Sequence, residues 1–452
     1  MQAAAALLGA PAVTAIAEEE THRLEDRPNI IFIMADDLGY ADLGCYGQKR
    51  IQTPHIDRLA AEGTRFTQCY AGAPQCAPSR SVLMTGLHTG HATVRGNHGQ
   101  NAPRHDGEAN RVPLKVDDVT VATLLKRAGY ATGITGKWGL GEPGSTGLPN
   151  DHGFDEWFGY LNQNHAADYY TDYLWRNKER QTIEGNLNGR RTVYSADLFS
   201  EFSLDFIRKN RANPFFLYVA TTIPHKNLEV PDLGIYADKP WPDDAKAFAA
   251  MVTRMDMQVG QIMALLKELD LDRKTIVFFT SDNGSAKGWE GMFDSCGPLR
   301  DKKFSLYEGG IRCPMIVRWP DKVPAGAVRD AVWYFADFLP TAANLGGASV
   351  PAQVDGTDVT AALLDKSQAL PERFLYWELP QGDTQPLRQA VRWKHWKAVR
   401  HGNDTKLELY DLLSDVGEEH NVSVEHPEVV ASIQEFLKTA RAPSPYWPAD
   451  CD

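Results

Sequence analysis

The sequence predicts an α/β fold, with a mostly parallel central sheet covered by helices on both faces and a smaller α+β subdomain behind it. Short runs rich in Ile, Val and Phe alternate with amphipathic stretches along the first 345 residues. These runs lack polar alternation, which is typical of parallel strands buried on both faces. Beyond Gly346-Gly347 the pattern changes to short strands joined by turns. The first pattern indicates a doubly wound domain, and the second indicates an antiparallel sheet.

The elements follow from these patterns in chain order. The runs expected to be buried strands are Asn29–Met34, Tyr130–Thr135, Phe215–Ala220, Thr275–Thr280 and Pro314–Trp319. The amphipathic stretches expected to be helices are Ile56–Glu62, Val119–Ala128, Ala196–Lys209 and Phe248–Leu269. The subdomain is expected to contain strands Arg373–Glu378, Gln389–Val391, Trp396–Val399 and Leu407–Asp411, and then a helix, Pro427–Arg441. We therefore divide the chain into a leader (1–26), a catalytic domain (27–345) and a C-terminal subdomain (346–452).

Composition narrows the possible partners and the compartment. The chain has 452 residues and a net charge of −12, which argues against nucleic-acid and anionic-membrane binding. No apolar run reaches the roughly 18 residues of a membrane helix, so membrane insertion is not expected. The Ala-rich start, ending Ala15-Ile16-Ala17, resembles the apolar region and cleavage site of a signal peptide without its basic start. It predicts export to the periplasm or the outside; the alternative is a disordered Ala-rich leader.

Polar residues follow four of the predicted strands. Asp36-Asp37 follow the first strand, Lys137 the second, His225 the third and Asp282-Asn283 the fourth. Ligands of open α/β sheets bind outside the carboxyl ends of the strands, so we expect these residues to converge. The acidic residues and Asn283 offer hard oxygen ligands, which suit Ca²⁺ or Mg²⁺ better than zinc. A hydrogen-bonded carboxylate cluster is the alternative, but three close carboxylates repel without a cation, which favours the metal.

The segment Cys76-Ala77-Pro78-Ser79-Arg80 indicates a nucleophile beside an anion site. Pro78 suits the first turn of a helix, whose free N–H groups attract an oxyanion. Arg80 lies four residues after Cys76, so the two share one helix face. By spacing alone, Cys76 could act as a thiolate.

Six blocks of the sequence resemble the type I, formylglycine-dependent sulfatases, in the order of that family. The blocks are Asn29–Gly47, Cys76–Gly86, Gly136-Lys137-Trp138, Pro224-His225, Ser281–Gly284 and Pro298–Pro314. The resemblance covers roughly residues 27–441 and implies a core like that of alkaline phosphatase. In the last block, Lys303 rather than Lys302 takes the position of the family lysine, and Asp301 stands where the family has Gly.

The resemblance implies a role for each residue. A sulfatase-maturing enzyme would convert Cys76 to formylglycine, whose hydrate is the nucleophile and also a ligand of one Ca²⁺, or Mg²⁺. The other implied metal ligands are Asp36, Asp37, Asp282 and Asn283. Arg80 would stabilise the ionised nucleophile, while Lys137 and Lys303 would hold the sulfate. His225 or Lys303 would protonate the leaving oxygen.

One residue departs from the family pattern at the implied site. Many members carry a His, implicated in expelling sulfate, where this chain has Gly139. Glycine cannot transfer a proton, so that role is vacant. His165, in a polar and aromatic stretch, is the candidate substitute and a candidate substrate-binding residue, although a lone loop His is commonly a surface residue.

These observations predict a sulfuric ester hydrolase that acts on an exported carbohydrate or aryl sulfate. Its partners would be a sulfated small molecule or glycan and the maturing enzyme. One alternative is a phosphomono- or phosphodiester hydrolase of the same superfamily. The other is a non-catalytic binder of sulfated glycans, which Gly139 and the need for modification would allow.

Overall fold

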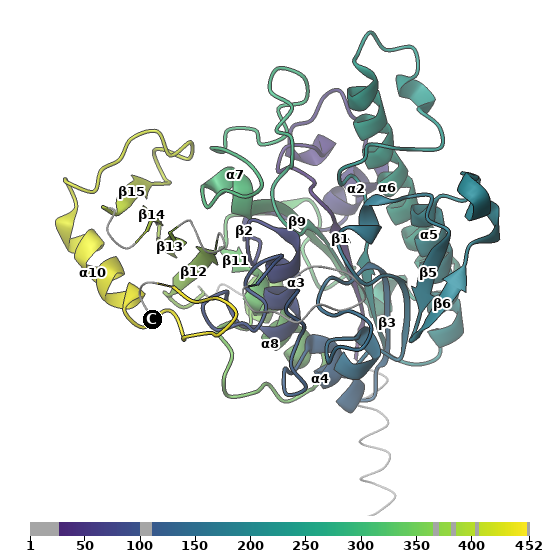
Figure 1. The fold of residues 1–452 in the computed structure, drawn as a ribbon, viewed down its shortest axis with the longest axis horizontal. Helices are drawn as coiled ribbons and strands as arrows, with labels where there is room; N and C mark the ends of the chain where they lie inside the picture. Colours follow the sequence, from purple (N-terminus) through teal and green to yellow (C-terminus); the bar gives the residue numbers. More distant parts are fainter. Residues whose placement is uncertain (1–26, 100–110, 365–369, 381–385, 403–405, 450–452) are drawn as a thin grey trace, which may run out of the picture.

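A computed structural model describes residues 27–99, 111–364, 370–380, 386–402 and 406–449. The predicted leader, 1–26, lies outside these residues. Figure 1 shows a large part built on one sheet and a smaller part at its side that contains β12–β15 and α10. This arrangement confirms the predicted fold class.

The central sheet has 11 strands within the described residues. They are β1 (Asn29–Ala35), β2 (Thr64–Tyr70), β3 (Ala131–Lys137), β4 (Glu156–Tyr160), β5 (Tyr173–Arg176), β6 (Glu179–Thr182), β7 (Phe215–Ala220), β8 (Thr275–Ser281), β9 (Arg312–Arg318), β10 (Ala327–Arg329) and β11 (Trp333–Tyr334). Their order is β10-β2-β9-β8-β1-β7-β3-β4-β5-β6, with β11 beside β2. The middle of the sheet, β8-β1-β7-β3-β4, is parallel.

Helices cover both faces of this sheet (Figure 1). One face carries α3 (Cys76–Thr85), α4 (Val121–Arg127) and α8 (Phe338–Gly346), and the other carries α2 (Pro54–Ala61), α5 (Ser195–Asn210) and α6 (Asp243–Glu268). All seven residues of β1 are buried, and they alternate between the two cores. Phe32 packs against Phe338 of α8 with ring centroids 4.3 Å apart, while Ile31 and Ile33 join the core on the α6 side. Burial on both faces explains why the strand has no polar alternation.

One strand direction differs from the expectation. The run predicted as Pro314–Trp319 forms β9, but β9 is antiparallel to both β8 and β2. The chain between β8 and β9, which includes the four-residue helix α7 (Glu308–Ile311), stays at one end of the sheet. Gly284 N donates to Gly310 O at 3.1 Å, so β9 begins beside the point where β8 ends and runs back antiparallel to it. A strand buried on both faces is apolar whichever way it runs, so its direction was not readable from composition. The more polar strand β2 and the shorter strands β4–β6, β10 and β11 were not predicted.

The C-terminal subdomain is an antiparallel sheet with one packed helix, as predicted. Its strands are β12 (Phe374–Leu379), β13 (Arg388–Trp393), β14 (Trp396–His401) and β15 (Glu408–Asp411), followed by α10 (Pro427–Leu437). Phe374 and Phe436 stack with ring centroids 4.5 Å apart. Trp377 Nε1 donates to Ala71 O at 2.8 Å, which ties the subdomain to the segment before α3. The helix ends four residues earlier than predicted; the boundary at residue 346 stays a prediction.

None of the described helices combines the length and the apolar character that crossing a membrane requires.

We expect Gly136→Ala to destabilise the fold strongly. Gly136 has φ +98°, and a Cβ there would lie 1.9 Å from Ala220 O on the neighbouring strand. The collision is with backbone, so β3 and β7 must separate, at about 2–4 kcal/mol of unfolding free energy. Urea unfolding of the purified protein measures this loss.

Gly144→Ala is the matched control for this prediction. Gly144 has φ +80° but nothing within 4 Å of its Cβ position, so the change adds backbone strain alone, about 1 kcal/mol. Equal losses in the two variants would show that the close approach of β3 and β7 is not what requires a glycine.

Candidate active site

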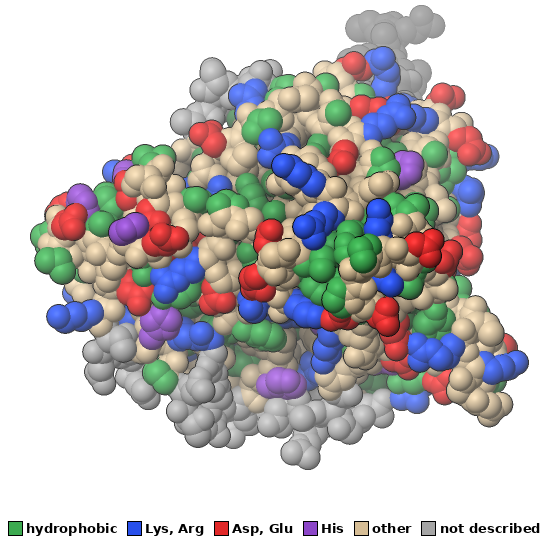
Figure 2. Space-filling view, turned by 90° about the horizontal axis from the view of Figure 1, so that it is seen from above, with side chains coloured by type: hydrophobic (Ala, Val, Ile, Leu, Met, Phe, Trp, Pro, Cys, Tyr) green, Lys and Arg blue, Asp and Glu red, His purple; other side chains and the backbone are tan. Residues whose placement is uncertain are grey.

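The predicted site residues meet at one end of the sheet. Strands β8, β1, β7 and β3 are neighbours, and Asp282, Asp36, His225 and Lys137 lie at or just beyond their carboxyl ends. The loops that follow β7 and β8 rise at the top of Figure 1, so Figure 2 looks onto this end of the molecule. Lys and Arg side chains gather near the middle of that face, among acidic ones. The sheet order thus brings together residues that are far apart in the sequence.

Three buried carboxylates each pair with a basic side chain. Lys137 Nζ lies 2.6 Å from Asp36 Oδ2, and Arg80 NH2 lies 2.8 Å from Asp282 Oδ2. The third pair joins Lys303 Nζ to Asp37 Oδ1 at 2.6 Å. Each carboxylate therefore has one basic partner, but burial, together with the charge of Asp36, still raises the pKa of Asp282 to about 6. The pairing reduces the repulsion that favours a cation and does not remove it.

The basic residues also keep the central carboxylate charged. Burial opposes ionisation of Asp36, but the positive charges around it, with Lys137 first, hold its pKa well below the usual range. Burial likewise opposes the charged form of Lys303, yet Asp37 raises the pKa of that ammonium group. The site is thus a set of fixed charges in a low-dielectric environment, where electrostatic interactions are stronger than in water.

A strained backbone conformation points the side chain of Asp37 into the site. Consecutive residues of a strand point to opposite faces, so two adjacent aspartates would normally diverge. Asp37 has φ +67°, in the left-handed region that Asp tolerates better than most residues. Its N–H donates to Asp282 Oδ1 at 3.2 Å, and its Oδ1 accepts from Asn283 Nδ2 at 2.7 Å. These bonds hold the strained turn and place both carboxylates in one site.

The donor set fits a hard divalent cation. Ligand atoms of Asp36, Asp37, Cys76 and His225 all lie within 4.8 Å of one another. Asn283 Oδ1 is buried without a hydrogen-bond partner, which is unusual unless a ligand binds there. The oxygen donors of Asp36, Asp37 and Asn283 suit Ca²⁺ or Mg²⁺, whereas Sγ and the imidazole are softer donors. Asp282, a further predicted ligand, is not among the four residues within 4.8 Å of one another.

Cys76 lies in the same cluster, at the first residue of α3. Its Sγ is 3.6 Å from Asp36 Oδ1 and 3.3 Å from Lys303 Nζ, and the residue is 1% exposed. Burial raises the pKa of the thiol to about 12, despite the nearby lysines. Cys76 is therefore a neutral thiol at neutral pH, which disfavours the thiolate alternative.

The start of α3 is less open to an anion than expected. The N–H of Ala77, one of the free donors of the first turn, donates to Asn97 Oδ1 at 3.0 Å. Ser79 Oγ donates to Asp282 O at 2.5 Å and fixes the helix against β8. Arg80 NH1 donates to Lys137 O at 2.7 Å, so this helix also holds the end of β3.

His225 lies at the edge of the charged cluster. Its Nε2 is 3.7 Å from Asp37 Oδ2, and its buried Nδ1 has no hydrogen-bond partner. Burial lowers the pKa of His225 to about 4, against the opposing effect of Asp36. The ring is neutral at neutral pH in this arrangement.

Lys303, and not Lys302, contacts Cys76, as the resemblance to the family block implies. Lys302 Nζ lies 3.5 Å from Glu290 and its side chain is 41% exposed. Asp301, which stands in place of a family Gly, has φ +63°. A glycine preference at this position follows from that left-handed backbone, which Asp also tolerates.

His165 contacts its own loop and the two strands on either side of that loop, β4 and β5. Its Nε2 lies 2.7 Å from Thr171 Oγ1, and its ring packs against Tyr160 and Tyr173. The residue that reaches Gly139 is Gln163. Sequence reasoning missed it because the stretch 162–165 contains three amide side chains and one His, and no spacing distinguished Gln163 from the others. A substrate-binding role for His165 stays a prediction.

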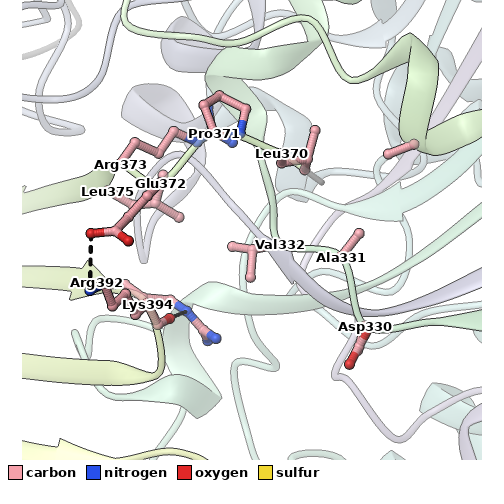
Figure 3. A pocket seen from close by; sticks show the side chains of 11 residues that line it. Asp330, Ala331, Val332, Leu370, Pro371, Glu372, Arg373, Leu375, Arg392 and Lys394 are labelled. Atoms are coloured by element: carbon pink, nitrogen blue, oxygen red, sulfur yellow. Dashed lines mark hydrogen bonds and ion pairs between the residues drawn. The ribbon is translucent and has the colours of Figure 1, made fainter. Parts of the chain in front are cut away.

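A surface pocket lies away from this charged cluster, between β12–β13 and the segment before β11. Figure 3 shows Leu370, Glu372, Arg373 and Lys394 around it. Its volume is about 460 Å³, and none of the predicted site residues lines it. Glu372 pairs with Lys394 at 3.2 Å, so two of its charged groups satisfy each other.

Comparison with known proteins identifies the family. The family model described as Sulfatase matches residues 28–348, which is more than half of the chain. The chain belongs to the sulfatase family. A second model, the C-terminal region of N-sulphoglucosamine sulphohydrolase, matches residues 298–442. The predicted family is therefore confirmed.

Two curated relatives show how far the similarity extends. The chain is 35% identical to the N-acetylgalactosamine-6-sulfatase of Canis lupus familiaris over 357 residues, covering 75% of this chain and 66% of the relative. The chain thus spans just under two thirds of the canine enzyme. It is 30% identical to the N-acetylgalactosamine-6-O-sulfatase of Bacteroides thetaiotaomicron, covering 94% of this chain and 95% of the relative.

Solved structures confirm the fold. The structure of Ps i-CgsB in complex with k-i-k-neocarrahexaose has a TM-score of 0.80 and 30% identity, covering 93% of this chain and 95% of that one. A Bacteroides thetaiotaomicron structure described under metabolism of multiple glycosaminoglycans has a TM-score of 0.75 and 28% identity, covering 92% and 99%.

We expect Asp282→Ala to lose both bound divalent cation and turnover. The change removes a predicted oxygen ligand, leaves Arg80 without its carboxylate and takes away the acceptor of the Asp37 N–H. Elemental analysis after dialysis against calcium measures the cation.

Asp256→Asn serves as the control. Asp256 is also fully buried, but it accepts from His55 N and Ile56 N at the start of α2. It should lose about 1 kcal/mol of stability and keep its cation. Full calcium content in Asp282→Ala would mean that the site is placed wrongly.

Proposed function

We propose that the protein hydrolyses a sulfate monoester of a carbohydrate, with Cys76 converted to formylglycine by a sulfatase-maturing enzyme and with one Ca²⁺, or Mg²⁺. The observation that supports this most is the position of Cys76, which contacts Asp36 and Lys303 inside a cluster of balanced buried charges. The predicted ligands for the cation are Asp36, Asp37, Asp282, Asn283 and residue 76. A bound cation would supply positive charge to the nucleophile and to the sulfate.

The surroundings of residue 76 support the modification. A buried thiol with a pKa near 12 is a poor nucleophile at neutral pH. The hydrated aldehyde would supply an oxygen nucleophile and a second hydroxyl that allows sulfate to leave. Asp36, whose pKa is held low, stays a charged carboxylate beside this residue, and Arg80, with NH2 3.5 Å from Asp36 Oδ2, is placed to balance the charge of an ionised hydroxyl there.

The charge balance favours sulfate over phosphate. Three carboxylates and three bases cancel. A divalent cation adds two positive charges, which one ionised hydroxyl and one sulfate monoester anion neutralise. A phosphate monoester dianion would leave an uncompensated negative charge in a buried site, which is costly. Lys137 and Lys303 then bind sulfate oxygens, where negative charge develops in the transition state.

Protonation of the leaving oxygen falls to His225 or Lys303. Lys303 carries its proton throughout, because Asp37 raises its pKa. His225 is neutral before substrate binds, but an anionic sulfate beside its ring raises its pKa and favours the protonated form. A neutral sugar hydroxyl needs this proton, since an alkoxide is a poor leaving group.

The relatives favour a carbohydrate substrate. Two curated relatives are named for sulfate at the 6-position of N-acetylgalactosamine, and one similar structure holds an oligosaccharide. A steryl-sulfatase of Mus musculus is also 32% identical, covering 82% of this chain and 70% of the relative. The test below therefore includes a steroid sulfate as an alternative substrate. We also propose that the protein is exported. This part of the proposal depends on the sequence of residues 1–26, which lie outside the described ranges.

We expect Cys76→Ala to keep the fold and abolish turnover of 4-nitrophenyl sulfate, because it removes only the nucleophile. Peptide mass spectrometry of the wild type should find the aldehyde in place of the thiol at residue 76. Cys296→Ala, at a partly exposed cysteine, is the matched control and should keep full activity.

Three outcomes would contradict the proposal. Wild-type turnover by Cys76→Ala would reject the nucleophile. Faster hydrolysis of 4-nitrophenyl phosphate than of the sulfate would favour the phosphatase alternative. Faster hydrolysis of a steroid sulfate than of any N-acetylgalactosamine 6-sulfate or galactose sulfate would reject the carbohydrate assignment.

We expect His225→Ala to reduce kcat about 100-fold or more on a sugar sulfate, but only slightly on 4-nitrophenyl sulfate. Nitrophenolate leaves without a proton, whereas a sugar alkoxide does not. The ratio of the two losses is the measurement. Equal losses would show that His225 holds the substrate and that the acid is Lys303.

A further inference from the structure

Gly139 leaves a space beside the anion site, and an amide fills it. Gly139 lies two residues beyond the end of β3 and has φ +82°. A Cβ at this position would lie 2.4 Å from Gln163 Nε2 and 3.9 Å from Arg80 Cδ. The side-chain amide of Gln163 therefore occupies the volume that any side chain at residue 139 would take, next to the side chain of Arg80.

Arg111 decides which end of this amide faces the site. The guanidinium of Arg111 donates to Gln163 Oε1. A guanidinium has donors and no acceptor, so the carbonyl oxygen of Gln163 must face Arg111 and its NH₂ must face the other way. Nε2 lies 3.4 Å from Gly139 O, which engages one of its two N–H groups only weakly. The side of Gln163 next to Arg80 is thus a hydrogen-bond donor.

A buried ion pair fixes Arg111 in turn. Arg111 Nε lies 3.5 Å from Glu142 Oε1, and both side chains are less than 10% exposed. Asn162 Nδ2 donates to Glu142 Oε2 at 3.3 Å. Burying an ion pair costs desolvation energy and seldom adds stability by itself. Here the pair has a specific effect, because it holds one orientation of a neutral amide.

We infer that Gln163 Nε2 donates a hydrogen bond to an oxygen of the bound sulfate beside Arg80, and that Arg111 and Glu142 are positioning residues for this donor. The inference rests on the proposed function. Gln163 takes the place that Gly139 leaves open, but it cannot take a proton from the nucleophile, because an amide has no titratable group at neutral pH. It adds a donor without changing the charge of the site.

The test compares Gln163→Ala and Gln163→Glu with the wild type. Loss of one donor to an anion should lower kcat/KM on 4-nitrophenyl sulfate about 10–100-fold in Gln163→Ala and weaken inhibition by inorganic sulfate by a similar factor. Gln163→Glu keeps the shape and the acceptor for Arg111, but it presents a negative oxygen to sulfate, so its loss should be larger. That loss should shrink toward acid pH, where the protonated carboxyl group donates again.

Matched variants separate this role from a structural one. Gln181→Glu makes the same charge change on exposed β6 and should leave the kinetics unchanged. Arg111→Met frees the amide to turn and should resemble Gln163→Ala, while Arg111→Lys, which keeps a donor, should restore part of the activity. A structural role would give losses in both glutamate and alanine variants that do not depend on pH.

Failure of the Gln163 inference can be distinguished from failure of the proposed function. Wild-type kcat/KM and sulfate inhibition in Gln163→Ala would overturn the inference and leave the sulfatase proposal intact. A wild type that carries formylglycine and hydrolyses no sulfate ester would overturn the proposed function. Calorimetry of inorganic sulfate with Cys76→Ser and Cys76→Ser/Gln163→Ala would still decide the inference, because equal affinities would contradict it.

Discussion

The structure depends on a balance of buried charges at the carboxyl ends of four neighbouring strands. Asp36, Asp37 and Asp282 are held out of water by pairing with Lys137, Lys303 and Arg80. Removing any one partner would leave a bare charge in a low-dielectric site, so the six residues constrain one another. The strained backbone at Asp37 and the hydrogen bonds of Arg80 to the end of β3 follow from this constraint. The same balance would allow a cation and a monoanion to bind together, which is the electrostatic reason for proposing a sulfate ester as the substrate.

The C-terminal subdomain contributes to this balance through the loop that carries Lys303. Lys397, on β14, is fully buried and donates to Leu306 O at 2.7 Å, and it pairs with Glu308 of α7. Nearby, Tyr307 OH donates to Glu408 of β15. These contacts fix the loop just after Lys303, the residue that reaches Cys76. Arg300 NH1 donates to Tyr410 OH and Glu418 O and fixes the loop just before it. The subdomain therefore holds one of the six charges in place, which gives a physical reason for its attachment to the catalytic sheet.

Gly139 and Gln163 show how one site can keep its shape while its chemistry changes. A glycine with positive φ removes a side chain, and a glutamine from a separate loop fills the space. The buried Arg111–Glu142 pair then sets the direction of the amide. A titratable group is thus absent from this position and a fixed donor is present. The proton for the leaving oxygen is proposed to come from His225 or Lys303, whose protonation states the surrounding charges control.

The sequence by itself determined the fold class, the four strand ends and the residues that meet there, because buried parallel strands are apolar throughout and polar residues directly after them share one edge. The Cys76–Arg80 segment was likewise readable from local spacing, and the choice of Lys303 over Lys302 followed from the resemblance to a family block. Only the tertiary structure decided the direction of β9, the pairing of each carboxylate with one base, the strained turn at Asp37 and the contact of Gln163 with Gly139. These features depend on atoms from distant segments meeting in space, and neither periodicity nor composition carries that information.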